Sequence, residues 1–301
     1  MSSYNQQIQH PLLEQQQVAL WIKREDLLHP IISGNKFRKL KYNIKDALAL
    51  GQKTILTFGG AYSNHIVATA CAAKEAGLKA IGVIRGEELK EKWKTNPTLV
   101  QAASYGMQFL FVTREAYRFK TEADYILKLK NEFGDFYHIP EGGTNALAVK
   151  GCEEILTEED KQFDIITCAV GTGGTVAGLI NSSTKNQKVL AYPALKGDFL
   201  KAEIDKFAIN DQWQLVTDYH FGGYAKVTES LVRFINEFKR DTGIPLDPIY
   251  TGKMLFGLWQ SIAQGSFAKG TKILAIHTGG LQGIKGMNQQ LIRRNLPVLD
   301  L

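Results

Sequence analysis

The stretch FDIITCAVGTGGTVAG (residues 163–178) indicates the class of fold that the whole chain adopts. Its first eight residues are largely apolar and contain no proline, which is typical of a strand buried in a parallel sheet. A glycine-rich turn follows directly, and small residues then continue in a helical pattern. A strand, a glycine-rich turn and a helix in this order form the repeating unit of α/β proteins.

The same alternation extends outward from this stretch through most of the 301 residues. Further strand-like runs lie at 54–58, 79–84, 108–112, 135–139, 188–192, 213–217 and 272–278. Helical patterns lie at 64–76, 122–133, 145–156, 228–241 and 252–264. The pattern predicts an α/β protein with twisted, mostly parallel sheets flanked by helices.

Composition and charge narrow the classes of function. Hydrophobic residues make up 44% and charged residues 22% of the chain, as in ordinary globular proteins. The 36 basic residues are scattered among 30 acidic ones, and this mixed pattern does not suggest binding to nucleic acid. No apolar run could span a membrane, and the polar start has no signal-peptide core. The sparse cysteines suit a reducing compartment. We expect a cytoplasmic protein, and we predict no metal site.

Four loops join a strand to a helix through glycine or small polar residues. They are residues 58–65, 140–146, 169–178 and 277–283. In open α/β sheets, ligands bind where the carboxyl ends of strands meet the amino ends of helices. Glycine lets the backbone approach a ligand closely, and free N–H groups there face an anion. These loops are therefore the candidate ligand-binding segments.

The loop Gly171-Thr172-Gly173-Gly174-Thr175 has the most specific pattern of the four. Its backbone amides and two threonine hydroxyls could converge on one phosphate group. It lacks the closing Gly-Lys-Ser/Thr of a nucleoside-triphosphate loop, and Val176 replaces the third glycine of a dinucleotide motif. The spacing favours a single phosphate. A tight strand-to-helix turn without a ligand remains the alternative.

Ser63, Asn64 and His65 resemble the start of a helix, where Ser and Asn are favoured. They could serve only as a cap. The sharper hypothesis is that the first amides of the helix and these side chains hold the carboxylate of an amino acid.

The segment SGNKFRKL (33–40) raises the question whether one of its lysines is reactive. We expect Lys39 and Lys41 to lie on a solvated helix face. Lys36 differs because a Gly-Asn turn precedes it and can place its side chain at a helix start. Nearby cations and helix dipoles lower the pKa of a lysine, and a neutral amine is required for Schiff-base chemistry.

Seven collinear motifs resemble the 1-aminocyclopropane-1-carboxylate deaminase/D-cysteine desulfhydrase family. The motifs are IKREDLLHPIISGNKFRKL, GGAYSNHIVATACAAKEAG, PEGGTNALAVKG, AVGTGGTVAG, GGYAKV, GIPLDPIYTGKMLFGL and ILAIHTGG, from Ile22 to Gly280. The resemblance implies a pyridoxal-phosphate enzyme with the tryptophan synthase β-like fold, known as fold type II. It also implies a small amino-acid substrate and a homodimer.

The resemblance also implies roles for individual residues. Lys36 matches the Schiff-base lysine, and Gly171 to Thr175 match the phosphate-binding loop. Asn64 matches the partner of the phenolic oxygen of the cofactor, and Ser63 to His65 match the substrate-carboxylate pocket. Two further residues, Tyr224 and Tyr250, match active-site tyrosines.

Thr251 bears on the choice of reaction within the family. Deaminase members carry an acidic residue at this position, which favours a protonated pyridine nitrogen and a strong electron sink. A threonine hydroxyl there implies a neutral ring nitrogen, which suits α,β-elimination better than opening of a cyclopropane ring. We therefore expect elimination from a small amino acid such as D-cysteine, giving pyruvate, ammonia and hydrogen sulfide. The segment 85–107 is shorter than in deaminase members, so the substrate is less firmly implied than the cofactor.

Three alternatives remain at this level. One is 1-aminocyclopropane-1-carboxylate deaminase activity, and another is a racemase or dehydratase acting on serine-like substrates. The third is a non-catalytic α/β protein that binds a phosphate or a nucleotide. We expect a large domain made of residues 1–45 and 142–301, and a small inserted domain made of residues 46–141.

Overall fold

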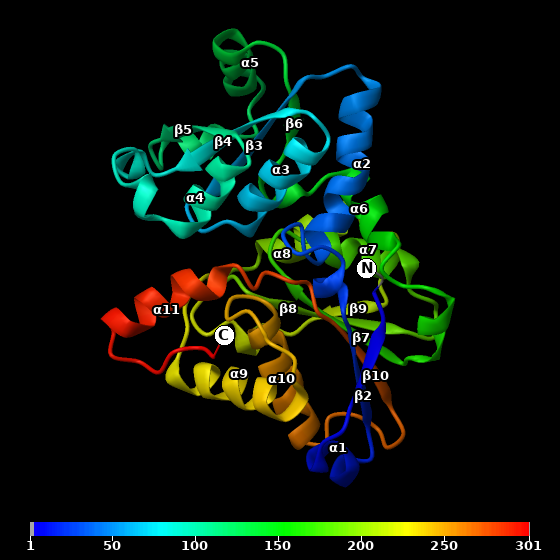
Figure 1. Ribbon diagram of the computed structural model, residues 1–301. Coiled ribbons are helices and arrows are strands. Elements are labelled where there is room, and N and C mark those ends of the chain that lie inside the picture. Colours follow the sequence, from blue (N-terminus) through cyan, green and yellow to red (C-terminus); the bar gives the residue numbers. More distant parts are fainter. Residues whose placement is uncertain (1–2, 301) are drawn as a thin grey trace.

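The structure is a computed structural model that describes residues 3–300, and it contains two sheets (Figure 1). The larger sheet has six strands in the order β1-β2-β10-β7-β8-β9, and the smaller has four in the order β5-β4-β3-β6. All pairs are parallel except β1 with β2. The predicted α/β class with mostly parallel sheets is confirmed.

The strands of the larger sheet are β1 (Asn5–Ile8), β2 (Ala19–Lys23), β7 (Ile165–Val170), β8 (Lys188–Pro193), β9 (Trp213–Leu215) and β10 (Lys272–Ile276). Those of the smaller sheet are β3 (Thr54–Gly60), β4 (Lys79–Arg85), β5 (Met107–Val112) and β6 (Tyr137–Ile139). Every predicted strand-like run forms a strand. The first two strands were not predicted from the sequence.

The α-helices are α1 (Pro11–Gln16), α2 (Asn35–Ala49), α3 (Asn64–Glu75), α4 (Pro97–Ser104), α5 (Ala123–Phe133), α6 (Ala146–Glu153), α7 (Gly174–Ser182), α8 (Phe199–Asp205), α9 (Glu229–Thr242), α10 (Thr251–Ala263) and α11 (Gly283–Arg293). Short 3₁₀ turns are η1 (Glu25–Leu27), η2 (Glu87–Leu89), η3 (Trp93–Thr95), η4 (Ala116–Phe119), η5 (Glu141–Gly143), η6 (Glu158–Gln162) and η7 (Thr217–Tyr219).

Each sheet is covered by apolar side chains on both faces. Successive residues of β10 alternate between two cores: Ile273 and Ala275 face one, whereas Leu274 and Ile276 face the other. Side chains alternate in this way along any strand, so a strand buried on both faces is apolar throughout. This explains why these runs could be recognised from the sequence.

Close helix packing places the site between the two sheets, where Figure 1 shows α2, α6 and α7 together. Helix α6 packs on both of the other two. A Cβ atom at Gly151 of α6 would lie 2.0 Å from the carbonyl oxygen of Arg38 in α2. A Cβ at Gly178 of α7 would lie 2.5 Å from the Cβ of Cys152 in α6. Only glycine permits such approaches, so these positions fix how α2 meets the larger sheet.

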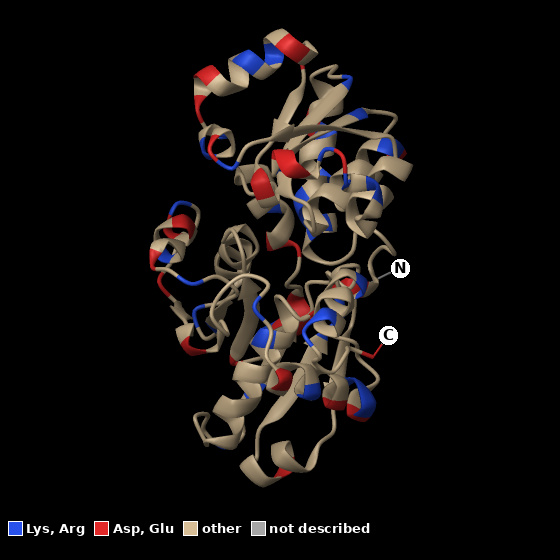
Figure 2. Cartoon of the chain, turned by 90° about the vertical axis from the view of Figure 1, so that its left-hand side faces the viewer, with Lys and Arg blue, Asp and Glu red and all other residues tan. Residues whose placement is uncertain are grey.

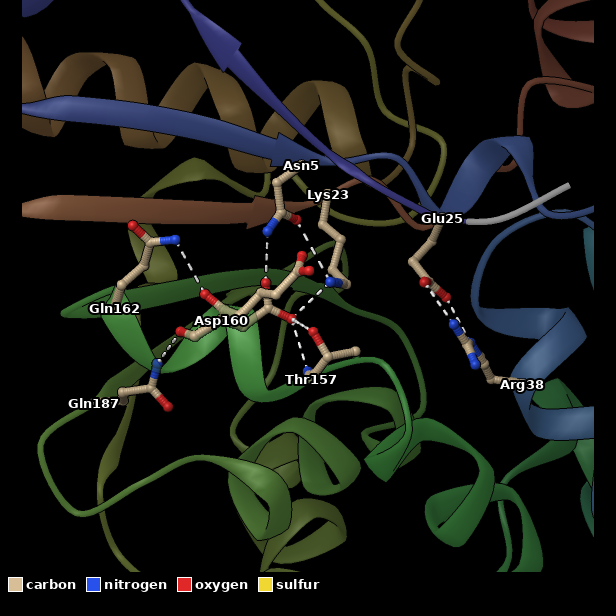
Figure 3. Close-up of polar contacts among 9 residues, drawn as sticks. Asn5, Lys23, Glu25, Arg38, Thr157, Asp160, Gln162 and Gln187 are labelled. Atoms are coloured by element: carbon tan, nitrogen blue, oxygen red, sulfur yellow. Dashed lines mark hydrogen bonds and ion pairs between the residues drawn. The ribbon is translucent and has the colours of Figure 1, made fainter.

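Buried ion pairs also fix the N-terminal segment (Figure 3). Arg38 of α2 donates two hydrogen bonds, of 2.8 and 2.9 Å, to the fully buried carboxylate of Glu25. Lys23 at the end of β2 lies 2.6 Å from Asp160, and both side chains are buried. The first pair orients the helix that carries Lys36.

Basic and acidic residues are interspersed over both parts of the molecule in the view of Figure 2. This agrees with the mixed charge pattern of the sequence. Within residues 3–300, no helix combines the length and the hydropathy needed to cross a membrane.

Candidate active site

Lys36 lies in the first turn of α2, as predicted. Gly34 precedes the helix with φ of 62°, and a Cβ atom there would lie 2.0 Å from the carbonyl oxygen of Thr278. Glycine is therefore required where α2 begins against the end of β10. Burial, followed by the charge of Lys39, lowers the pKa of Lys36 to about 7. A large share of this amine is neutral near pH 7, as a nucleophile requires.

Lys39 occupies a position that the sequence analysis assigned wrongly. It was expected on a solvated face, but only 2% of it is exposed. Its Nζ donates hydrogen bonds to the carbonyl oxygen of Gly142 at 3.0 Å, to Thr144 at 2.9 Å and to Thr172 at 3.3 Å. The helix face that carries Lys39 packs against two of the glycine loops, which explains its burial. Lys41 is exposed as predicted and pairs with Glu154 at 2.6 Å.

The loop Gly171–Thr175 connects β7 to α7 and lies beside Lys39. Helix α7 begins at Gly174 without a side-chain cap, after Gly173 with φ of 85°. Among residues 3–300, the N–H groups of the loop find no hydrogen-bond acceptor. Asn35, the neighbour of Lys36, donates a hydrogen bond of 2.8 Å to Thr175. The loop, Lys36 and Lys39 are thus brought together.

This corner of the site suits an anion. The buried ammonium of Lys39 contacts three neutral oxygens, and within residues 3–300 no carboxylate pairs with it. A buried charge without a counter-charge is costly. A phosphate group on the free amides of Gly171–Thr175 would supply that counter-charge. Burial also lowers the pKa of Lys39, and a bound anion would oppose this effect.

The start of α3 places Asn64 against the loop that follows β10 of the larger sheet. Ser63 is the N-cap residue but makes no capping bond with its side chain. Asn64 donates a long hydrogen bond of 3.4 Å to the carbonyl oxygen of Gly280, after β10. Its Oδ1 is buried and has no partner among the described residues. The amide of Asn64 is thus under-used and free to bind a ligand.

His65 is placed differently from the expectation that it binds a substrate carboxylate. Its ring is 2% exposed, and its Nε2 lies 2.8 Å from Thr57 Oγ1, which donates its own proton to the carbonyl of Ile139 at 2.8 Å. His65 Nε2 must therefore carry the proton of the ring. Burial, and then the charges of Lys36 and Lys39, lower the pKa of His65 well below its ordinary value. The ring is committed to the smaller sheet, and only the backbone N–H of His65 remains for an anion.

Tyr224 and Tyr250 lie together, with ring centroids 6.3 Å apart. A Cβ atom at Gly171 would lie 3.3 Å from the hydroxyl of Tyr250, so the pair borders the loop Gly171–Thr175. Although 40% of Tyr224 is exposed, desolvation of its hydroxyl raises its pKa, and burial raises the pKa of Tyr250 well above the ordinary value of 10.0. Both phenols therefore keep their protons at neutral pH and can act as acids, not as bases.

Thr251 does not have the environment expected from the sequence. Its hydroxyl donates to Asp247 Oδ2 at 2.6 Å and accepts from the N–H of Asp247 at 3.0 Å. The hydroxyl proton is therefore used within the protein and is not available for a pyridine nitrogen. Asp247 also accepts hydrogen bonds from the N–H groups of Ile249, Tyr250 and Thr251. The role of Thr251 is to fix the start of α10, where Tyr250 lies.

The residues present fit pyridoxal phosphate. Lys36 offers a neutral amine for its aldehyde, and the loop Gly171–Thr175 with Lys39 offers amides and charge for its phosphate. Asn64 offers an amide donor for its phenolic oxygen. Sequence reasoning missed Lys39, Thr144 and Asp247. Lys39 could have been found from its spacing, because residues three apart share one helix face.

Comparison with known proteins identifies the family. Residues 6–279 match the family model described as "Pyridoxal-phosphate dependent enzyme". A Pyrococcus horikoshii protein, named provisionally as a 1-aminocyclopropane-1-carboxylate deaminase, is 35% identical over 88% of this chain and 85% of its own length. The bifunctional D-cysteine desulfhydrase/1-aminocyclopropane-1-carboxylate deaminase of Arabidopsis thaliana is 32% identical over 88% of this chain and 73% of its own length.

A solved structure gives the same result for the fold. The crystal structure of a homologue of 1-aminocyclopropane-1-carboxylate deaminase superposes with a TM-score of 0.82 and 30% identity, covering 97% of this chain and 94% of that one. The alternative of a non-catalytic phosphate-binding protein is therefore not retained. The chain belongs to the family of pyridoxal-phosphate-dependent enzymes and has their type II fold.

Proposed function

We propose that the protein catalyses α,β-elimination from a small amino acid, with D-cysteine as the favoured substrate. Cysteine and water would give pyruvate, ammonia and hydrogen sulfide. One arrangement carries the proposal. A Lys36 amine with a pKa of about 7 occurs in the same site as an anion-binding corner and two protonated tyrosines. The relatives named as desulfhydrase or deaminase support the same class of reaction.

When bound, pyridoxal phosphate would supply an electron-withdrawing ring bonded to the substrate amino group. The start of α3 would hold the substrate carboxylate through Ser63 and the free amides of Asn64 and His65. Lys36, once displaced, would accept the α-proton at its neutral Nζ. Tyr224 or Tyr250 would donate a proton to the departing sulfur, since both hydroxyls stay protonated.

The start of α10 favours elimination over ring opening. Position 251 carries no carboxylate, and four hydrogen bonds occupy the carboxylate of Asp247. This segment therefore offers no free acid to strengthen electron withdrawal. A reaction with a good leaving group on the β-carbon needs less electron withdrawal from the substrate. The sequence led to the same preference for elimination, but it relied on a free hydroxyl at Thr251. The structure shows that this hydroxyl is not free, so the preference rests on the absence of a free carboxylate instead.

A substrate panel tests the proposal. The purified, cofactor-loaded protein would be incubated with D-cysteine, L-cysteine, D-serine and 1-aminocyclopropane-1-carboxylate, and keto acid and sulfide would be measured. We expect equal amounts of pyruvate and sulfide from D-cysteine and none with Lys36→Ala. Turnover of the cyclopropane substrate alone would establish the deaminase alternative instead.

We further propose that the protein is a cytoplasmic homodimer and that residues 46–141 move as a unit over the substrate. All four strands of the smaller sheet lie between residues 54 and 139, which supports that unit, although its first boundary falls inside α2. Light scattering during gel filtration would test the dimer. A mass of one chain would contradict it.

A further inference from the structure

The loop that carries Tyr224 has an unusual backbone. In the segment HFGGYAK (220–226), Phe221 and Ala225 have φ of 55°, and Gly222 and Gly223 have φ of 90° and 116°. Phe221 and Ala225 are two of the four non-glycine residues with positive φ in the described chain. Such conformations are unfavourable for L-residues, so other contacts must hold the loop in place.

Lys253 of α10 makes those contacts. It is 2% exposed, and its Nζ donates hydrogen bonds to the carbonyl oxygens of His220 at 2.9 Å and Gly223 at 2.7 Å. The same two carbonyls close two successive turns, because they accept from the N–H groups of Gly223 at 3.0 Å and Lys226 at 3.2 Å. The ammonium of Lys253 therefore joins both turns. Tyr224 lies directly after Gly223, the residue that the two turns share.

The placement of Lys253 is difficult to explain by stability alone. Within residues 3–300 it forms no ion pair, and a buried ammonium bonded only to carbonyls is a costly way to fill space. Burial lowers its pKa to about 8. Lys253 also lies in the first turn of α10, three residues after Tyr250, which is the N-cap residue of that helix. It is thus rigidly linked to one active-site tyrosine and hydrogen-bonded to the loop that carries the other.

We propose that Lys253 is a positioning residue that holds the Tyr224 loop against the start of α10, so that the two phenols face the same substrate. The inference deepens the proposed function and rests on it for its effect on turnover. Its structural part, the fixing of residues 220–226 by the ammonium, does not depend on the identity of the substrate.

Hydrogen exchange of the cofactor-loaded protein tests the structural part. Lys253→Met keeps the length of the side chain and removes the donor. We expect amide exchange in residues 220–226 to accelerate at least tenfold, with the other segments of the larger sheet unchanged. Lys23→Met removes another buried lysine, paired with Asp160, and should leave exchange in this loop unaltered. Unchanged protection of the loop in Lys253→Met would overturn the inference.

A double-mutant cycle tests the catalytic part. We expect Lys253→Met to lower kcat 10- to 100-fold with little change in KM, and to have no further effect in a Tyr224→Phe background. Independent, multiplying effects would show that Lys253 does not act through Tyr224 and would overturn the proposal. Lys253→Gln, which keeps an amide donor, should recover part of kcat, and it replaces Lys253→Met if that variant does not fold. If the wild-type protein fails to release sulfide, the proposed function fails while the exchange result still decides the role of Lys253.

Discussion

Two lysines one helical turn apart in α2 have opposite roles in the proposed function. There, Lys36 acts when it has lost its proton, whereas Lys39 acts when it keeps its charge beside the loop Gly171–Thr175. Each affects the other, because the charge of Lys39 contributes to lowering the pKa of Lys36. In the proposed function, the pair would thus provide a nucleophile and an anion-binding charge from a single turn of helix.

The reactivity of Lys36 should therefore change with pH near 7, well below the range in which an ordinary lysine loses its proton. In the cofactor-free protein, we expect reductive methylation of Lys36 by formaldehyde to increase with pH and to level off just above pH 7. An ordinary lysine would continue to gain reactivity to about pH 10.4. Peptide mass spectrometry measures the label at each pH. In Lys39→Met the midpoint should move to higher pH, because a neighbouring positive charge has been removed.

The same pKa shift predicts a stability effect with a definite sign. The unfolded chain holds this proton up to the ordinary lysine value of 10.5, whereas the folded chain loses it near 7. The unfolded state thus binds more protons between these values, and the free energy of unfolding of the cofactor-free protein should rise with pH across them. Lys36→Met should make this rise smaller, the remainder coming from Lys39 and Lys253, whose pKa values burial also lowers, and the variant should be more stable than the wild type at pH 6 in urea titrations. A wild-type curve that is flat or falling between pH 7 and 9 would contradict the assignment.

At the scale of single elements, the start of α10 is held by an unusual reciprocal cap. The carboxylate of Asp247 accepts from three backbone N–H groups and from Thr251 Oγ1, and Thr251 accepts in return from the N–H of Asp247. Loss of a capping side chain costs about 0.5–2 kcal/mol. Here the cap also places Tyr250, so its loss should affect function as well as stability.

Asp247→Ala should lower the stability by about 2 kcal/mol and also reduce kcat at least tenfold. Urea unfolding and steady-state kinetics measure the two effects. Asn96→Ala is the matched control, since Asn96 caps α4 in the smaller sheet region through two N–H groups. It should lower stability by a similar amount while kcat stays near the wild-type value. Equal losses of kcat in both variants would mean that the effect of Asp247 is not local.

Helices and strands can be predicted from the sequence when the features that stabilise them appear in their own residues. Strands such as β7 and β10 are buried on both faces, so their apolar runs identify them without tertiary information. Strand β1 has the polar sequence NQQI and forms by antiparallel pairing with β2 at an edge of the sheet. Nothing local predicts it. The helical spacing from Lys36 could have placed Lys39 on the same helix face, but its hydrogen-bond partners lie more than 100 residues away in the sequence and could not be predicted locally.

At the scale of the molecule, the glycine loops bring distant segments together at the site. A Cβ atom at Gly280 would lie 2.9 Å from the amide of Asn64, and one at Gly174 would lie 2.8 Å from Thr144. The collinear motifs predicted which segments take part but not how they touch. His65 and Thr251 show the limit, since the side chain of each was expected to face a ligand and instead hydrogen-bonds a residue of the protein.

Because the site draws on both sheets, occupancy should stabilise the whole fold. Pyridoxal phosphate would join Lys36, the loop Gly171–Thr175 and Asn64 at the start of α3, the helix that follows β3 of the smaller sheet. At a hundredfold excess over Kd, binding contributes about 2.7 kcal/mol, which corresponds to a rise in Tm of roughly 5–10 °C. Thermal unfolding of the cofactor-free protein, followed with and without the cofactor, measures this rise.

Binding of inorganic phosphate tests the anion-binding corner independently of the remainder of the site. Millimolar phosphate should raise the Tm of the cofactor-free wild type by a smaller amount than the cofactor does, and it should have no effect on Lys39→Met. Lys41→Met, which removes an exposed lysine from the same helix, should respond like the wild type. An equal response of the Lys39 variant and the wild type would mean that the buried ammonium does not bind the anion, and the orientation proposed for the cofactor would have to be reversed.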